Sequence, residues 1–192
     1  PDEPIKPRKM LIIGIAFILG LLLGIITVFI RKSMRRGIQD PDLIEKALNV
    51  PVYATVLHSR SQVTLNSKLS QDPNAVSHQT VILAIEERED MAIESLRSLR
   101  TTLHFALLEA KNNIILITGP SPGVGKSFIS VNLATVMADA GKKILLIDAD
   151  MRKGTIHKFL GVSRERGLSE IALQTVSADE AICKIPLANI DF

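Results

Sequence analysis

The sequence predicts an α/β fold in which a parallel sheet, flanked by helices, follows one transmembrane helix. Three observations support this prediction. Residues 10–30 contain no charged side chain, residues 113–139 read as a strand, a glycine-rich turn and a helix, and residues 143–148 read as a second, buried strand. The sheet is expected to be incomplete at the C-terminus, because the alternating apolar run 185–190 reads as an unfinished strand. The chain begins at Pro1 rather than methionine, so we expect it to be an excerpt of a longer protein.

The apolar run 10–30 is expected to be a membrane span, preceded by a proline-rich periplasmic end, 1–9. At about 1.5 Å per residue it would extend over roughly 30 Å, the thickness of a hydrocarbon core. A buried core helix would show a polar face, and a signal peptide would be shorter and carry a cleavage site. More lysines and arginines follow the run than precede it, which favours a cytoplasmic location for residues 31–192. Gly20 and Gly24 would let two such helices approach closely, although glycine is common in such helices.

Composition argues against several classes of function. The net charge of +3 is modest, and its cations crowd beside the apolar run, where membrane orientation explains them. The chain has no tryptophan and one tyrosine, Tyr53, so it lacks an aromatic platform for stacking bases, and no nucleic acid partner is expected. Cys183 is the single cysteine and suits a reducing compartment. The histidines show no metal-ligand spacing.

Residues 31–85 are expected to form a juxtamembrane segment and a linker. Asp40 and Pro41 are typical of a helix start, and this short helix should run through about Leu48. Residues 50–56 then read as a short strand. Residues 58–80 are rich in serine, glutamine, asparagine and aspartate, which predicts a flexible linker.

A long helix, 86–111, is expected to open the soluble domain, 86–192. Its apolar residues recur at spacings of three or four between Met91 and Leu107. Glu94, Arg97 and Arg100 lie three residues apart on one stripe. Spacing alone favours a solvated helix face with an i,i+3 ion pair for this stripe.

The run 119–127, GPSPGVGKS, predicts a phosphate-binding loop of the P-loop NTPase type. Gly123 and Gly125 would let backbone N–H groups converge on phosphate oxygens, Lys126 would reach the β- and γ-phosphates, and the Ser127 hydroxyl would bind Mg²⁺. The usual motif has glycine six residues before the lysine, whereas here Pro120 occupies that position. The residues expected to bind the nucleotide are Pro122, Gly123, Val124, Gly125, Lys126, Ser127, Phe128 and Arg152.

A second strand should deliver Asp148 and Asp150 to the carboxyl edge of the sheet, where ligands bind in open α/β folds. Acids two residues apart on an extended chain point the same way, so both could face the Mg-phosphate site; the alternative is a pair of solvated loop acids. Asp148 could orient Mg²⁺ through water or act as a base. Lys126, Asp148 and Asp150 are the expected catalytic residues, with Ser127 and the two acids as metal ligands. Arg152 could reach phosphate or a neighbouring subunit.

Together these features resemble one family. The paired-acid run IDADMRKG, the Pro-Gly before Val-Gly-Lys-Ser, and the helix run MAIESLRSLRTTLHF are similar to bacterial tyrosine kinases. The closer resemblance is to the proteobacterial, membrane-anchored polysaccharide co-polymerase type that accompanies capsule and exopolysaccharide export. It covers nearly the whole chain, including the prolines before the span and the GIQDPD stretch after it.

The resemblance implies an ATP- and Mg²⁺-dependent protein-tyrosine autokinase in the bacterial inner membrane. Glu94, Arg97 and Arg100 match the family's Glu-x-x-Arg-x-x-Arg oligomerisation motif, which replaces the solvated-face interpretation. Subunits would form a homo-oligomeric ring and phosphorylate tyrosines of a neighbour, with a cognate tyrosine phosphatase and the polysaccharide export machinery as partners. The span would be the second of two. The family's later Walker B acid and C-terminal tyrosine cluster are not in this chain, so the chain alone is expected to be inactive.

Two other functions are compatible with these residues. A switch ATPase of the partitioning or septum-placement type, as in MinD and ParA, would hydrolyse ATP to change its dimer state. Such proteins carry a signature lysine where this chain has Ser121, and they lack the span 10–30. A polysaccharide co-polymerase scaffold would use its nucleotide site only to regulate assembly. The sequence leaves open which polysaccharide is exported, the number of subunits, and the downstream substrates.

Overall fold

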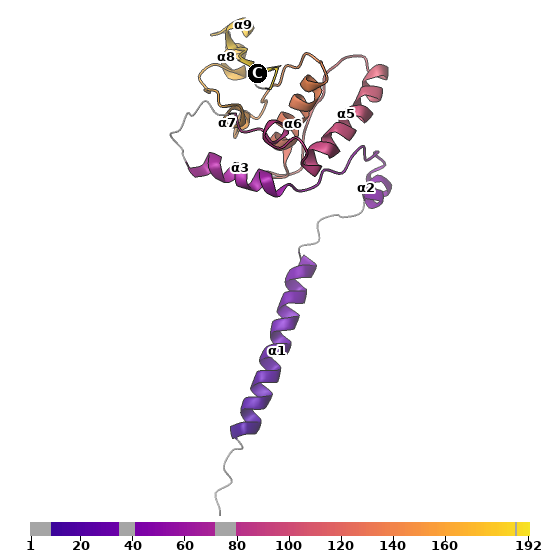
Figure 1. Cartoon of the computed structure of the whole chain (residues 1–192), viewed down its shortest axis with the longest axis vertical. Coiled ribbons are helices and arrows are strands. Elements are labelled where there is room, and N and C mark those ends of the chain that lie inside the picture. The colour runs from indigo at the N-terminus through magenta and orange to yellow at the C-terminus, as the bar shows by residue number, and fades with distance from the viewer. Residues whose placement is uncertain (1–8, 35–40, 72–79, 187) are drawn as a thin grey trace, which may run out of the picture. The chain divides into compact units, whose positions relative to one another are not determined.

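The computed structural model describes residues 9–34, 41–71, 80–186 and 188–192. The chain divides into two compact units, Pro1–Val52 and Tyr53–Phe192, and each is described by itself (Figure 1). The four-part division expected from the sequence, with a soluble domain starting at residue 86, stays a prediction.

The described residues of the first unit form two helices, α1 at Lys9–Met34 and α2 at Pro41–Leu48. α1 confirms the predicted helix, and its segment Met10–Arg31 has the length and hydropathy of a membrane-crossing helix. The hydroxyl of Thr27 donates to the carbonyl of Leu23 at 2.7 Å, so this polar group is satisfied within the apolar segment. The cations at 35 and 36 and the predicted cap Asp40 lie outside the described residues.

α2 occupies the residues predicted for it, but the strand predicted for 50–56 is wrong. The backbone N–H of Val52 donates to the side-chain Oε1 of Glu45 at 2.7 Å rather than to a neighbouring strand. The chain that follows α2 is therefore held by the helix itself, and its alternating apolar residues pair with no strand in the part of the chain that the structure describes.

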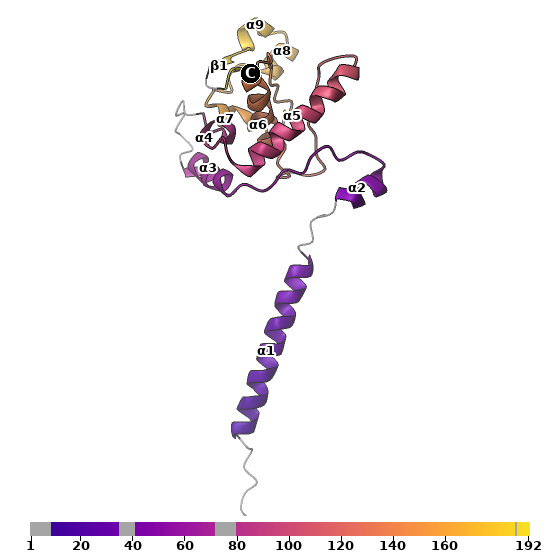
Figure 2. The same ribbon diagram turned by 45° about the vertical axis from the view of Figure 1, so that its right-hand side comes forward.

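The second unit is mostly helical and has a small sheet (Figure 2). Its elements are α3 (Arg60–Gln71), α4 (Leu83–Glu86), α5 (Met91–Glu109), α6 (Lys126–Asp139), α7 (Ile156–Leu160), α8 (Leu168–Ala172), α9 (Ala178–Ala181), β1 (Lys184–Ile185) and β2 (Ile190–Asp191). α5 and α6 lie side by side in both views, and α6 is the central helix because residues 131–136 are all buried. Leu83, Ile93 and Leu96 pack into the same core.

Part of the predicted linker 58–80 is helical, because α3 spans Arg60–Gln71; residues 72–79 lie outside the described residues. Two caps explain this difference. Ser59 Oγ accepts the amide of Gln62 at 3.1 Å and donates to Asp90 Oδ2 at 2.6 Å, while Asp90 Oδ1 accepts the amide of Ala92 at 2.8 Å. One serine thus caps α3 and connects it to the cap of α5. Leu65, 7% exposed, anchors α3 to the core.

The long helix predicted for 86–111 begins later, at Met91, and ends at Glu109. A short helix, α4, precedes it, and the chain turns between the two, where Asp90 caps α5. Apolar periodicity placed the body of this helix correctly, and the capping acid decided where it starts.

The predicted parallel sheet is not confirmed. Residues 114–118 are extended without a strand partner among the described residues, and Ile114 is 79% exposed. The run 143–148 makes one parallel bridge, between Leu145 and Asp191, supported by a hydrogen bond from Leu146 N to Asp191 O at 2.8 Å. The run 185–190 forms a hairpin instead of one strand, with β1 and β2 antiparallel and Asn189 at a φ of 51° in the turn.

Candidate phosphate-binding site

The glycine loop before α6 has the backbone conformation expected of a phosphate cradle. Gly123 and Gly125 have φ values of 80° and 99°, in the left-handed region that disfavours side chains. A Cβ at either position would meet nothing within 4 Å, so glycine is needed here for its conformation and not for lack of space. Left-handed residues in such turns aim successive N–H groups into an anion-binding concavity.

Gly119 explains the departure from the usual spacing of the loop. A Cβ at this position would lie 2.8 Å from Val124 Cγ2 and 3.3 Å from Lys126 Cγ. A side chain here would therefore push aside the side chain of Val124 and crowd that of Lys126. The usual motif has its first glycine at the position that Pro120 occupies here. In this chain the close approach, and therefore the glycine, lies one position earlier, at Gly119.

Lys126 begins α6, a helix of 14 residues with no acidic residue in its first turn. Its ammonium Nζ donates to the carbonyl of Ser121 at 3.0 Å, so the side chain curls over its own loop. The positive end of the helix and the ammonium group therefore act together on the space above the loop. Phe128, in the first turn of α6, packs against the core and anchors the start of the helix.

The two predicted acids follow the run 143–147 and are held by backbone amides. Asp148 is half-buried and accepts hydrogen bonds from Asp150 N and from Ile156 N, each at 3.1 Å. Asp150 is exposed, and its Oδ1 accepts hydrogen bonds from Arg152 N at 3.2 Å and Lys153 N at 2.9 Å. The carboxylates thus organise the loop that follows them.

Charge connects Asp150 to the phosphate loop. The hydrogen bonds from the backbone of Lys153 and Arg152 lower the pKa of Asp150, and the positive charges of Lys126 and Arg152 lower it further. Asp150 is therefore ionised at neutral pH and lies within electrostatic reach of Lys126. That these two residues form one site stays a prediction.

A second link joins α6 to residues 148–155, which we call the acid loop. Ser127 Oγ lies 3.2 Å from Thr155 Oγ1, and Thr155 directly precedes the amide that Asp148 accepts. Gly154 lets the acid loop fold back onto Asp148, since a Cβ there would lie 2.8 Å from Asp148 Oδ2 and 2.9 Å from Asp150 O.

Sequence reasoning missed three residues here, Gly154, Thr155 and His157. The one available signal was their position, directly after the IDADMRK run. Burial lowers the pKa of His157, and the charges of Arg164 and Lys158 lower it further, while Asp148 opposes them. His157 is therefore mostly neutral at pH 7 beside the acid loop.

The donor set fits Mg²⁺. Ser127, Asp148 and Asp150 offer oxygen atoms, the ligands that Mg²⁺ prefers. Among the described residues there is no group of three or more histidine, cysteine or acidic side chains that could hold a metal unaided. An ion at this site would need phosphate oxygens to complete its shell, which is how Mg²⁺ is usually bound with nucleotides.

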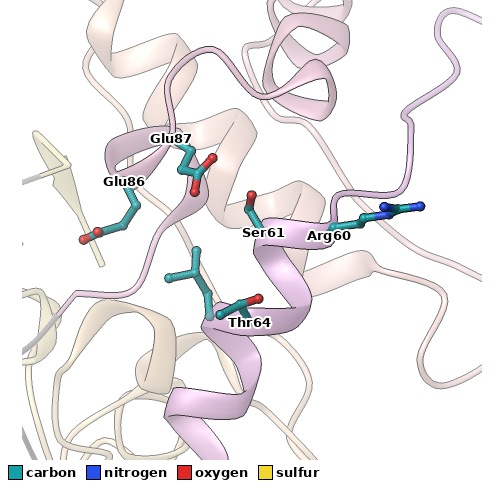
Figure 3. Close-up of a pocket in the computed structure, with 6 residues that line it drawn as sticks. Arg60, Ser61, Thr64, Glu86 and Glu87 are labelled. Atoms are coloured by element: carbon teal, nitrogen blue, oxygen red, sulfur yellow. The ribbon is translucent and has the colours of Figure 1, made fainter.

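A shallow hollow in the second unit lies elsewhere, between α3 and the turn after α4. Figure 3 shows Glu86 and Glu87 there, opposite Ser61 and Thr64. Arg60 also lines this hollow, but the two carboxylates outnumber it, and neither the glycine loop nor Asp148 and Asp150 contribute to it, so the hollow is not the predicted nucleotide site.

The three residues predicted for oligomerisation do not act alike within one chain. Glu94 and Arg97 form an ion pair one helical turn apart on the surface of α5. Arg100 Nη1 instead donates to the carbonyl of Val136 at 3.3 Å, in the last turn of α6. Arg100 therefore ties α5 to the helix that carries the phosphate loop.

Two family models match the chain. Residues 115–179 match "CobQ/CobB/MinD/ParA nucleotide binding domain", which covers the glycine loop and both acids, and residues 1–33 match "G-rich domain on putative tyrosine kinase".

Individual proteins are similar over most of the chain. A putative tyrosine-protein kinase EpsB of Ralstonia solanacearum is 43% identical over 192 residues, covering 100% of this chain and 25% of the relative. The tyrosine-protein kinase ptk of Acinetobacter johnsonii is 47% identical over 171 residues, covering 89% of this chain and 23% of the relative. The solved BceF tyrosine kinase domain has a TM-score of 0.72 at 42% identity, covering 82% of this chain and 62% of that structure. The chain thus spans about a quarter of the length of these curated relatives.

Proposed function

The chain belongs to the family of bacterial tyrosine kinases, and from this premise we propose that its complete gene product is an ATP-dependent protein-tyrosine autokinase that regulates capsule or exopolysaccharide synthesis and export. Tyrosines of a neighbouring subunit would be its substrates. One observation carries the proposal: a left-handed glycine loop begins α6, and Ser127 in the first turn of that helix contacts Thr155 of the loop that Asp148 holds, at 3.2 Å.

The roles of the site residues follow from their positions. The backbone of Gly123 and Gly125 and the start of α6 would bind the ATP phosphates, and Lys126 would leave the carbonyl of Ser121 to reach the β- and γ-phosphates. Pro122, Val124, Phe128 and Arg152 would complete the nucleotide site. Bound Mg²⁺ would neutralise phosphate charge. Ser127, Asp148 and Asp150 would hold it.

The transfer would break the bond between the γ-phosphorus and the bridging oxygen and form a bond from phosphorus to the tyrosine oxygen, with ADP leaving. The phenolic proton must go to a base. The lowered pKa makes Asp150 a poor proton acceptor and a good cation ligand. Asp148, which binds the acid loop through both oxygens, would orient the metal and its water or take the proton.

The proposal also includes the fold and the membrane topology of the whole protein. Residues 114–118 and 143–148 would be parallel strands of a sheet, and the parallel bridge from Leu145 to Asp191 supports a strand at 143–148. Residues 1–9 would be periplasmic, 10–30 would span the bacterial inner membrane, and 31–85 would connect to a cytoplasmic domain starting at 86. The excess of cations after the apolar run supports this orientation.

Assembly would use the surface of α5. Glu94 and Arg97 are close enough to pair within one chain, and both are partly exposed, so either could exchange its partner for a neighbouring subunit in a ring. Arg100 would then connect that surface to α6. A tyrosine phosphatase and the export machinery would be the further partners.

The proposal is tested on the purified, complete gene product with Mg-ATP, probed for phosphotyrosine. Lys126→Met and Asp148→Asn should both abolish the signal of the unaltered protein. Mixing Lys126→Met protein with active protein should restore phosphotyrosine on the Lys126→Met chains, because transfer occurs between subunits.

The other two functions are distinguished by the same samples. Phosphate release that depends on Lys126, without phosphotyrosine, would favour a switch ATPase, the class to which MinD and ParA belong. Bound ATP with neither activity would favour a scaffold.

A further inference from the structure

The hydroxyl pair formed by Ser127 and Thr155 connects the two halves of the candidate site. The oxygens are 3.2 Å apart, and both side chains are half-buried. Geometry alone leaves either oxygen free to be the donor. Which hydroxyl donates follows from what Ser127 must do when it binds a metal ion.

The position of Thr155 depends on the acid loop and not on the phosphate loop. Asp148 accepts amide hydrogen bonds from Asp150 and from Ile156, so the loop between them closes around the carboxylate. Gly154 passes so near that a Cβ would lie 2.8 Å from Asp148 Oδ2. Thr155 is therefore placed by two hydrogen bonds and by one glycine before it contacts Ser127.

A serine hydroxyl that binds a cation must offer a lone pair to the ion and direct its proton away. If Thr155 donated to Ser127 Oγ, it would occupy one of the two lone pairs of that oxygen, beside the cation, and the serine proton would have no acceptor in this pair. With Ser127 as the donor and Thr155 Oγ1 as the acceptor, both requirements are met. Hydrogen-bond partners of this kind orient the groups that bind a metal and commonly change its affinity by tenfold or more.

We propose that Thr155 is a positioning residue that accepts a hydrogen bond from the Ser127 hydroxyl and so orients the serine oxygen toward the Mg²⁺ of the bound nucleotide. This inference rests on the proposed nucleotide site, and it adds a residue outside the phosphate loop and the paired acids. Thr155 acts through Ser127 and touches neither phosphate nor the reacting atoms in this account.

The test uses the complete gene product and a fluorescent ATP analogue, with binding measured as Mg²⁺ is titrated and again in EDTA. Thr155→Val keeps the shape of the side chain and removes the acceptor, so the Mg²⁺ concentration for half-maximal binding should rise about tenfold. Binding in EDTA should not change, because the loop that holds the phosphates is intact. Thr155→Ser should behave as the unaltered protein.

Thr175→Val is the matched control, because the Thr175 hydroxyl donates to the carbonyl of Glu170, remote in sequence from the loop. It should leave the Mg²⁺ midpoint unchanged. If Thr155→Val does not fold, as judged by its loss of binding in EDTA, Thr155→Ala replaces it with the same expectation.

Three results would overturn the inference: an unchanged Mg²⁺ midpoint in Thr155→Val, an equal rise in Thr155→Ser, or nucleotide binding by the unaltered protein that does not respond to Mg²⁺. Failure of the kinase proposal gives a different pattern, in which Mg²⁺-dependent binding is sensitive to Thr155 but no phosphotyrosine forms.

Discussion

Replacing Asn132 with leucine is expected to loosen α4 from α6. Asn132 is 1% exposed, its Oδ1 accepts the amide of Ala84 at 2.8 Å, and its Nδ2 donates to the carbonyl of Phe128 at 2.9 Å. Ala84 is 2% exposed, and its amide lies in the first turn of α4, where no acceptor exists within the helix. Leucine has a similar volume but no acceptor, so the Ala84 amide would be buried without a partner.

An unsatisfied buried donor costs about 1–3 kcal/mol, whereas the carbonyl of Phe128 keeps its partner within α6. A middle value of about 2 kcal/mol corresponds to roughly thirtyfold faster exchange of the affected amides, since 1.4 kcal/mol is about tenfold. Hydrogen exchange of the complete gene product, followed on the peptide that contains Ala84, measures this directly.

Asn112→Leu is the control for the Asn132 experiment, because Asn112 is exposed and caps only the amide of Ile114. It should leave exchange at Ala84 unchanged. Exchange in Asn132→Leu within about threefold of the unaltered protein would refute the claim that this side chain holds α4 in place.

Three further predictions concern the acid loop. Gly154→Ala should raise the Mg²⁺ concentration needed for half-maximal nucleotide binding. Gly167→Ala is the control and should not, because its Cβ would meet only a side-chain oxygen at 3.7 Å. Equal effects of the two substitutions would contradict the role given to the close packing of Gly154. The lowered pKa of Asp150 means that its charge persists as the pH falls past the usual aspartate pKa and is lost only on passing the lowered value, so a carboxyl NMR titration with a midpoint at or above 3.8 would disagree. Arg164→Gln should raise the pKa of His157 in a proton NMR titration, because one of the charges that lower it is removed; an unchanged midpoint would exclude that role for Arg164.

Local chemistry predicted several elements well. α6 begins at Lys126 as expected, because a left-handed glycine at 125 ends the loop and the helix follows directly. α2 begins at Pro41, whose missing N–H costs nothing at a helix start. In both cases the signal lies within a few residues of the boundary.

Elements that depend on distant partners were predicted less well. The polar composition of 58–71 predicts a linker, yet Ser59 finds Asp90, 31 residues away, and α3 forms. Residues 114–118 have the composition of a buried strand, but Leu116 is 82% exposed and the run has no strand partner among the described residues. A strand is completed by the segments that pair with it, so its own composition is insufficient to predict it.

The same distinction explains the site. The glycines, Lys126 and the two acids were identifiable because their chemistry is contained in short runs of sequence. Thr155 and Gly154 were not, because their importance arises only when the acid loop closes and brings Thr155 within 3.2 Å of Ser127. A threonine has no intrinsic preference that would mark it as the partner of a particular serine 28 residues earlier.

In the stripe of Glu94, Arg97 and Arg100, regular spacing predicts a shared helix face but not the partner of each side chain. Three charges at i, i+3 and i+6 predict one shared surface, and the ion pair between Glu94 and Arg97 agrees with that expectation. Arg100 departs from it, because the carbonyl of Val136 is one of the last four in α6 and attracts a cation. Removing the Arg97 charge should therefore affect contacts of the α5 surface alone, whereas removing the Arg100 charge should also weaken the packing of α5 on α6. A side chain on one helical stripe can thus bind its own domain while its neighbours remain available to another subunit.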